Sequence, residues 1–211
     1  MSSEESNKMS KKTLSQDSNF NFLGVYDNAL SKEECNKVLQ IYEHATRGRI
    51  GYHVGLLDRD NYPHKRAHTL ACDLKSFPIE EHHGINSYVE SALSRALQHY
   101  IEKYSFLKQM GLWHWDTPYN VQKYKEGEGY YTLHCEHAVD FPRRILVWMV
   151  YLNDCECGTE YPYQDTIVDA KAGRVVFWPA GWTHPHKGVT PNKGVKYIAT
   201  GWYSYYEKHT N

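Results

Sequence analysis

The sequence predicts a mainly β protein, a double-stranded β-helix or jelly roll with two or more N-terminal helices packed on its outer sheet. Two stretches with apolar residues at helical spacing lie before Gly111. Short runs rich in Val, Ile, Tyr and Trp follow it, separated by Gly, Pro and Asn-Asp. Helices gathered ahead of a series of short strands are typical of a jelly roll with one sheet face covered.

The two helices have distinct sequence signals. The first is expected to begin at Ser31, an N-cap residue with Glu34 three positions later, and its apolar residues recur at helical spacing as far as Ala45. The second covers residues 85–104, where the apolar residues fall on one stripe and polar residues lie opposite. Both helices are predicted to be scaffold.

Eight short strands are expected after Gly111. Their predicted ranges are 119–124, 130–136, 145–152, 159–163, 166–168, 173–178, 183–188 and 196–205.

The length of 211 residues fits one domain, with residues 1–18 as a disordered tail and residues 19–211 as a single folded unit. The tail is predicted to be disordered because it contains almost no apolar residues. Within the folded unit, residues 19–111 form a helical extension and residues 112–206 the jelly-roll core.

Charge and apolar patterning exclude several classes of partner. The net charge of -1 gives no basic field for nucleic acid, and no stretch approaches the roughly 20 apolar residues that span a bilayer. The polar N-terminal sequence does not resemble a signal peptide, so a cytoplasmic location is expected. The five cysteines are then predicted to be free thiols, including the Cys155 and Cys157 pair.

A candidate metal site begins with His134 and Glu136, two positions apart in a predicted strand. Side chains alternate along a strand, so both are expected on one face, where they can share an ion. Two histidines and one carboxylate form a facial triad that binds Fe(II) and leaves positions open for oxygen chemistry. His184 and His186 are both candidates for the third ligand, and spacing alone does not choose between them.

A candidate anion site lies close to the predicted metal site. Lys196 follows His186 by ten residues, after a segment rich in Gly, Pro and Asn that is typical of a hairpin turn. A lysine inside a small barrel is costly unless it binds an anion, so a ligand carrying a carboxylate is indicated. Tyr151 and Tyr124 are candidates to point into the same cavity. The six tryptophans supply aromatic surface for an apolar cavity or for the core.

Three segments taken together resemble the prolyl-4-hydroxylase-like branch of the 2-oxoglutarate/Fe(II)-dependent oxygenases. They are YNVQKYKEGEGYYTLHCE, RRILVWMVYLND and GRVVFWPAGWTHPHKGVTPNKGVKYIATGW, and the match spans roughly residues 119–203. The order and spacing of several motifs agree at once. These are a tyrosine ten residues before an HxD motif, a YLN strand, and a distal histidine followed ten residues later by a basic residue.

The resemblance implies a role for each matching residue. His134, Glu136 and His186 would hold Fe(II), and the ten-residue offset to Lys196 selects His186 over His184. His184 would then be a residue near the metal ligands, on the substrate side or at the surface. Lys196, Tyr151 and Tyr124 would bind 2-oxoglutarate.

Two positions depart from the family pattern. Glu136 stands where most relatives have Asp, and Cys157-Gly158 stands where they usually have two glycines. Asp140 is an alternative carboxylate ligand, although it lies beyond the predicted strand.

The implied activity is hydroxylation of a C–H bond, with Fe(II) as metal, 2-oxoglutarate and O2 as cosubstrates, ascorbate as a candidate reductant, and succinate and CO2 as products. The substrate stays open between a prolyl residue in a protein, a free amino acid and a small metabolite. Two other interpretations remain: a metal-binding jelly-roll module without turnover, and a cupin-type dioxygenase independent of 2-oxoglutarate.

Overall fold

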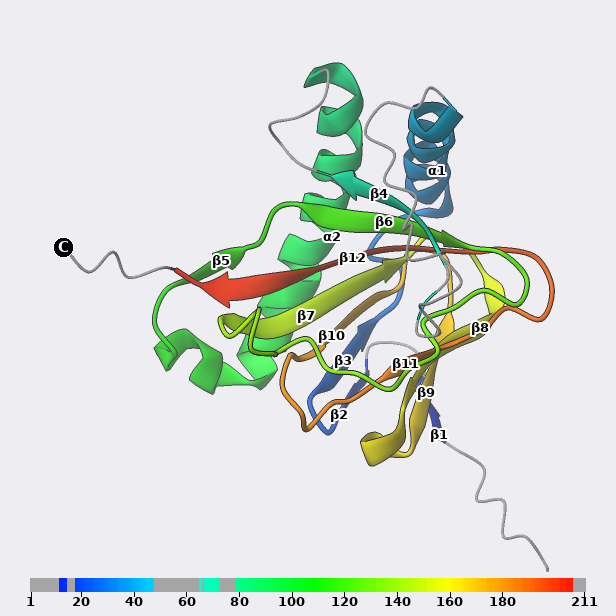
Figure 1. The fold of residues 1–211 in the computed structure, drawn as a ribbon. Helices are drawn as coiled ribbons and strands as arrows, with labels where there is room; N and C mark the ends of the chain where they lie inside the picture. The colour runs from blue at the N-terminus through cyan, green and yellow to red at the C-terminus, as the bar shows by residue number, and fades with distance from the viewer. Residues whose placement is uncertain (1–11, 15–17, 48–64, 66, 73–78, 207–211) are drawn as a thin grey trace, which may run out of the picture.

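The computed structural model describes residues 12–14, 18–47, 65, 67–72 and 79–206. Two β-sheets face each other, and two α-helices cover the outer face of the larger sheet (Figure 1). The helices are α1 (Lys32–Arg47) and α2 (Ile79–Lys103), followed by the short 3-10 helix η1 (Ser105–Gln109).

The larger sheet has the strand order β2-β3-β10-β7-β12-β6-β4, and β5 pairs with β12. The smaller sheet has the order β1-β9-β8-β11. The strands are β1 (Lys12–Leu14), β2 (Ser18–Phe20), β3 (Leu23–Tyr26), β4 (His68–Cys72), β5 (Trp113–Trp115), β6 (Tyr119–Tyr124), β7 (Arg144–Tyr151), β8 (Cys155–Tyr161), β9 (Thr166–Ala170), β10 (Val175–Pro179), β11 (Lys187–Val189) and β12 (Lys196–Tyr205). A second 3-10 helix, η2 (Pro162–Gln164), connects β8 to β9.

The predicted capping box is present at the start of α1. The Glu34 backbone N–H donates to Ser31 Oγ at 3.2 Å, and the Ser31 N–H donates to Glu34 Oε2 at 2.8 Å. These bonds satisfy two backbone donors that the helix cannot pair internally.

No helix in the described part of the chain has the length and apolarity to cross a membrane, and the cytoplasmic location stays a prediction.

Alternation along the strands of the larger sheet separates two hydrophobic clusters. On β7, Trp148 and Val150 pack with α1 and α2, whereas Val147, Met149 and Tyr151 face the smaller sheet. Because successive side chains of a strand point to opposite faces, β7 contributes to both clusters. The interior between the two sheets is where the candidate site lies.

The predicted fold class is confirmed, and two strand ranges, 119–124 and 196–205, agree with β6 and β12 at both ends. Residues 130–136 were predicted to be a strand, and this is wrong. This segment forms isolated bridges at Tyr130 and His134, and the Glu136 N–H donates to the Ala180 carbonyl instead of continuing a ladder. The strand predicted at 183–188 is likewise reduced to β11, at 187–189.

The N-terminal region contains strands that the sequence analysis did not predict. Lys12–Leu14 pairs in parallel with β9, and Ser18–Phe20 pairs with β3, so Lys12–Leu14 and Ser18 of the predicted tail lie in strands. The remaining residues of the 1–18 range lie outside the described part of the chain. A strand edge supplies backbone hydrogen bonds whatever the side chains are, and composition therefore gave no signal for this pairing.

The expectation that all cysteines are free thiols is wrong for Cys155 and Cys157, which form a disulfide. A register irregularity between Cys155 and Gly158 interrupts the pairing of β8 with β9. It brings the two cysteine Cα atoms to 5.2 Å, within the range that a disulfide spans. Cys35 and Cys135 are free thiols.

Gly173→Ala is expected to destabilise the fold strongly. Gly173 has a φ of +78°, and an added Cβ would lie 1.9 Å from the Leu30 carbonyl oxygen. The left-handed backbone alone costs an L-residue about 1–2 kcal/mol, and the clash adds to this. Gly111→Ala is the matched control, because Gly111 has a φ of +87° with nothing within 4 Å. Urea unfolding should show a larger loss of free energy for Gly173→Ala, and equal losses would contradict the role of the clash.

Candidate active site

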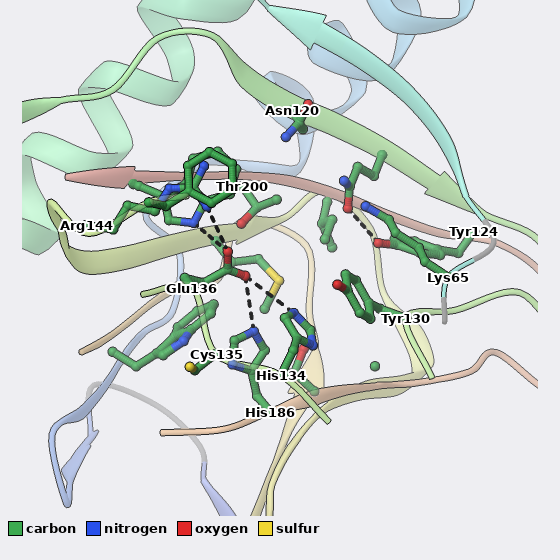
Figure 2. A pocket seen from close by; sticks show the side chains of 18 of the residues that line it. Lys65, Asn120, Tyr124, Tyr130, His134, Cys135, Glu136, Arg144, His186 and Thr200 are labelled. Carbon is green, nitrogen blue, oxygen red and sulfur yellow. Dashed lines mark hydrogen bonds and ion pairs between the residues drawn. The ribbon is translucent and has the colours of Figure 1, made fainter. Parts of the chain in front are cut away.

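The candidate metal ligands come from two segments that the fold brings together. His134 and Glu136 lie between β6 and β7, and His186 lies just before β11. The His134 N–H donates to the His186 carbonyl at 3.1 Å, and the His186 N–H donates to the His134 carbonyl at 2.9 Å. This two-residue bridge fixes both imidazoles side by side in the interior between the sheets (Figure 2).

The side chains of these residues converge on one point. Glu136 Oε1 lies 3.4 Å from His134 Nε2 and 3.6 Å from His186 Nε2, and one ligand atom from each residue lies within 4.8 Å of the others. Such separations are compatible with atoms that are each about 2.0–2.2 Å from one shared ion. The group is therefore able to hold a metal in a 2-His-1-carboxylate arrangement.

The other nitrogen of each imidazole is held by the backbone. His134 Nδ1 lies 2.9 Å from the Thr132 carbonyl oxygen, and His186 Nδ1 lies 3.1 Å from that of His184. A carbonyl accepts only, so both Nδ1 atoms carry a proton. Nε2 is then the atom available to a metal in each ring, and the ring orientations are fixed in the way typical of metal-binding histidines.

Glu136 is fixed through its second oxygen. Oε2 accepts a hydrogen bond from Trp202 Nε1 at 2.9 Å and another from Arg144 at 3.3 Å. Burial by itself would raise the pKa of the Glu136 carboxyl, but the imidazoles of His134 and His186 lower this pKa well below its usual value. Glu136 is therefore ionised, with Oε1 directed at the two histidines. The extra methylene relative to Asp is accommodated in this geometry.

His184 and Asp140 do not join the group. His184 is buried, with Nδ1 at 2.9 Å from Thr183 Oγ1 and Nε2 at 2.7 Å from the Asn21 carbonyl oxygen. Both ring nitrogens are thus used away from the metal ligands. The His184 carbonyl accepts the bond from His186 Nδ1, so His184 lies next to a metal ligand and is not a surface residue. Asp140 is exposed and lies outside the convergent group.

Lys196 is a buried cation whose hydrogen bonds to the described residues go to uncharged groups. Its ammonium donates to the carbonyl oxygens of Gly158 and Val189 at 3.2 and 3.1 Å and lies 4.9 Å from the centre of the Tyr124 ring. Burial lowers the pKa of Lys196 to about 8. An ammonium that meets carbonyls and a ring face among the described residues, on the wall of a cavity, is suited to a carboxylate ligand.

The cavity has a volume of about 280 Å³, close to the lower end of the roughly 300–1,000 Å³ typical of small-molecule sites. Tyr124 lines it, and its hydroxyl donates to Gln122 at 2.5 Å. Tyr151 does not line it: its hydroxyl bonds Thr159 Oγ1 at 2.7 Å and the Val168 carbonyl. Thr159 lines the cavity, so Tyr151 contacts a lining residue, and its role in binding 2-oxoglutarate stays a prediction.

Several lining residues carried no sequence signal. Arg144 and Trp202 contact Glu136, and Lys65 reaches the cavity from the segment before β4. Trp202 was recognised only as aromatic surface. The Arg144 guanidinium lies 3.8 Å from the centre of the Phe141 ring and 3.5 Å from that of Trp202, so two aromatic faces hold it.

The double-stranded β-helix and the convergent His, Glu and His side chains define the class of a non-haem oxygenase. Residues 119–204 match the family model described as 2OG-Fe(II) oxygenase superfamily. The match covers the jelly-roll core, and this part of the chain is similar to the 2-oxoglutarate/Fe(II)-dependent oxygenases, a family that uses Fe(II), 2-oxoglutarate and O2. No match was found among curated protein sequences.

Solved structures of prolyl hydroxylases share this fold. A prolyl hydroxylase from Trichoplax adhaerens, in complex with a peptide fragment of the hypoxia inducible factor oxygen degradation domain, is 19% identical with a TM-score of 0.67 and covers 87% of this chain and 84% of its own. The viral collagen prolyl hydroxylase of Paramecium Bursaria Chlorella virus-1, in complex with 2-oxoglutarate, is 17% identical with a TM-score of 0.60, covering 86% and 95%. A Pseudomonas putida prolyl-4-hydroxylase is 13% identical with a TM-score of 0.60, covering 88% and 94%.

Proposed function

We propose that His134, Glu136 and His186 bind Fe(II) and that Lys196 binds the C5 carboxylate of 2-oxoglutarate, so that the enzyme hydroxylates a C–H bond of its substrate. The observation that carries this proposal is the pairing of three convergent ligand atoms with a buried cation on the wall of one cavity. A prolyl residue in a protein is the first candidate substrate, because the structural neighbours are prolyl hydroxylases.

When bound, Fe(II) would supply the oxidising chemistry, in which one atom of O2 would enter the substrate and the other would enter succinate as 2-oxoglutarate loses CO2. The chain positions the reactants. Oε1 of Glu136 and the two Nε2 atoms would hold the metal, while the bonds from Trp202 and Arg144 hold Oε2. Glu136 would thus offer one oxygen to the metal, and a 2-His-1-carboxylate set of this kind would leave room for cosubstrate and O2.

The cavity walls control where 2-oxoglutarate lies. The Lys196 ammonium fixes one end, and the Tyr124 ring and Thr159 border that end. Met149, Trp178 and Ile198 provide apolar surface that limits water. An oxidant generated in such a cavity meets bound substrate in preference to solvent.

Succinate formation tests the proposal. Purified protein with Fe(II), ascorbate, 2-oxoglutarate and O2 is expected to release succinate, and more of it when a prolyl peptide is accepted. Mass spectrometry should then find one added oxygen atom in that peptide. Absence of both iron binding and succinate would refute the proposed activity. Succinate without any modified prolyl peptide would refute the prolyl substrate alone.

Trp202→Phe is expected to weaken metal binding without unfolding the protein. Phenylalanine keeps an aromatic face beside Arg144 but lacks the N–H that bonds Glu136 Oε2. Loss of such a partner of a metal ligand typically costs about 10–100-fold in metal affinity. Titration with Co(II) in place of Fe(II) measures this effect, and the melting temperature serves as the control. Unchanged Co(II) affinity would show that the indole N–H does not orient Glu136.

A further inference from the structure

The cavity carries more positive than negative charge. Among its described lining residues are three cations, Lys65, Arg144 and Lys196, and one carboxylate, Glu136. The proposed ligands leave this imbalance unchanged, because the two positive charges of Fe(II) equal the two negative charges of 2-oxoglutarate. Charge interactions are strong in a cavity that excludes water. An excess of cations therefore remains for the substrate to meet.

Lys65 is the cation with the fewest partners. Its backbone is anchored to Tyr130 by an antiparallel bridge, and its Nζ lies 5.3 Å from the centre of the Tyr130 ring. The same ring stacks on His134 with centroids 3.7 Å apart, so the Tyr130 ring contacts both Lys65 and a proposed metal ligand. Within the described part of the chain, the Lys65 ammonium has no hydrogen bond and no carboxylate partner.

The protonation of Lys65 suits an anion. Burial lowers the pKa of Lys65 to about 8, and the charge of Glu136 opposes this shift. Lys65 is therefore still mainly protonated at pH 7. A partly buried ammonium that contacts no carboxylate among the described residues is unfavourable, and a carboxylate beside it would compensate the cost.

Arg144 adds a second positive group across the site. One of its N–H groups bonds Glu136, which leaves other donors of the planar guanidinium for a ligand. Figure 2 shows Lys65 and Arg144 on either side of Glu136. Asp116, the nearby carboxylate that also acts on the pKa of Arg144, accepts a bond from Ser204 and lies 3.4 Å from His114 Nδ1.

We propose that the substrate carries a carboxylate close to the carbon that is hydroxylated, and that Lys65 binds this carboxylate. The positive charge of Arg144 adds to the electrostatic attraction for it. The inference rests on the proposed function and names the substrate class of the same site. For a prolyl substrate, two sources supply this chemistry: the carboxylate of a free or N-acylated proline, and the side chain of an acidic residue next to a peptide proline. The positive cavity would disfavour uncharged analogues of equal size.

Binding of matched probes tests the substrate charge. The small-molecule pair is N-acetyl-L-proline and N-acetyl-L-prolinamide, which differ by one negative charge. The peptide pair places Asp or Asn directly after proline in an otherwise identical capped peptide. Each probe is titrated into full-length protein loaded with Fe(II) and 2-oxoglutarate without oxygen. Fluorescence of Trp178 and Trp202, which line the cavity, reports binding.

The anionic member of at least one pair is expected to bind tenfold or more tightly than its neutral partner, and the pair that responds identifies the source of the carboxylate. Lys65→Met should reduce this preference to about twofold or less, whereas Lys65→Arg should keep it. Lys108→Met, which removes an exposed lysine outside the cavity, is the control of equal charge change and should leave the preference intact.

The outcomes distinguish failure of this inference from failure of the proposed 2-oxoglutarate-dependent activity. Equal binding within both pairs, no binding of either anionic probe, or a preference that survives Lys65→Met would each overturn the inference while 2-oxoglutarate binding and succinate release stand. A tenfold loss of 2-oxoglutarate affinity in Lys65→Met would assign Lys65 to the cosubstrate and also overturn it. Failure of the wild-type protein to bind 2-oxoglutarate or form succinate would remove the proposed function itself.

Discussion

His186→Ala is expected to abolish tight metal binding, whereas His184→Ala should retain it. His186 contributes Nε2 to the convergent group, and loss of a ligand should cost more than the roughly 10–100-fold typical of residues that only orient a ligand. Both ring nitrogens of His184 bond groups away from the metal ligands. The two histidines are two residues apart and both buried, so each substitution controls for the other.

Metal titration with Co(II) and the absorption spectrum of the Co(II) complex measure this difference directly. His184→Ala should show a stability loss instead, because it removes two partly buried hydrogen bonds that contribute about 0.5–1.5 kcal/mol each. Thermal unfolding of the metal-free proteins separates the two effects. Equal loss of Co(II) affinity in both variants would overturn the assignment of His186 as the distal ligand.

Lys196→Met is expected to lower 2-oxoglutarate affinity by roughly 10- to 100-fold while metal binding persists. The estimate follows from the loss of a charge-assisted hydrogen bond, worth about 1.5–3 kcal/mol. Methionine fills similar space without charge, so the Tyr124 ring keeps a neighbour. Binding to the Co(II)-loaded protein measures the affinity without turnover. Unchanged 2-oxoglutarate affinity would show that another group anchors the cosubstrate.

The same lysine predicts a pH dependence for 2-oxoglutarate binding. The pKa of Lys196 in the free protein is about 8, so the ammonium is charged below this pH and loses its proton above it. Affinity should therefore be constant below pH 8 and should fall as pH rises further, by up to about tenfold per unit. Arginine stays charged over this pH range, so a Lys196→Arg protein that binds 2-oxoglutarate should not show this dependence. The same titration in Lys65→Met removes any contribution from Lys65, the other cavity lysine with a pKa of about 8.

The sequence predicted those elements whose signal is local. The start of α1 follows from Ser31 and Glu34, which form the capping box within four residues. The bounds of β6 and β12 follow from β-prone runs ending at turn residues. The strands β2, β3 and β4 were missed because they are short and pair with partners far along the chain, which leaves no periodic pattern to read.

The candidate site shows the same division. His134, Glu136, His186 and Lys196 were named from spacing together with a resemblance to a family, and they do line one cavity. The segment that carries His134 and Glu136 is not the strand that the sequence predicted. The segment from 130 to 136 is held by the His134–His186 bridge and by bonds to Ala180, which are contacts between distant parts of the chain.

By itself, the sequence determined the fold class and the residue types available for metal and cosubstrate, because alternation, capping and motif spacing are properties of neighbouring residues. Only the tertiary structure decided how Glu136 is oriented and how the cavity is charged. Trp202 lies 66 residues after Glu136 in the sequence, and the pairing of β12 with β7 brings the two side chains together. Lys65 reaches the same cavity from the segment before β4. Hydrogen bonds and fields act through space, so their partners follow from folding and not from order along the chain.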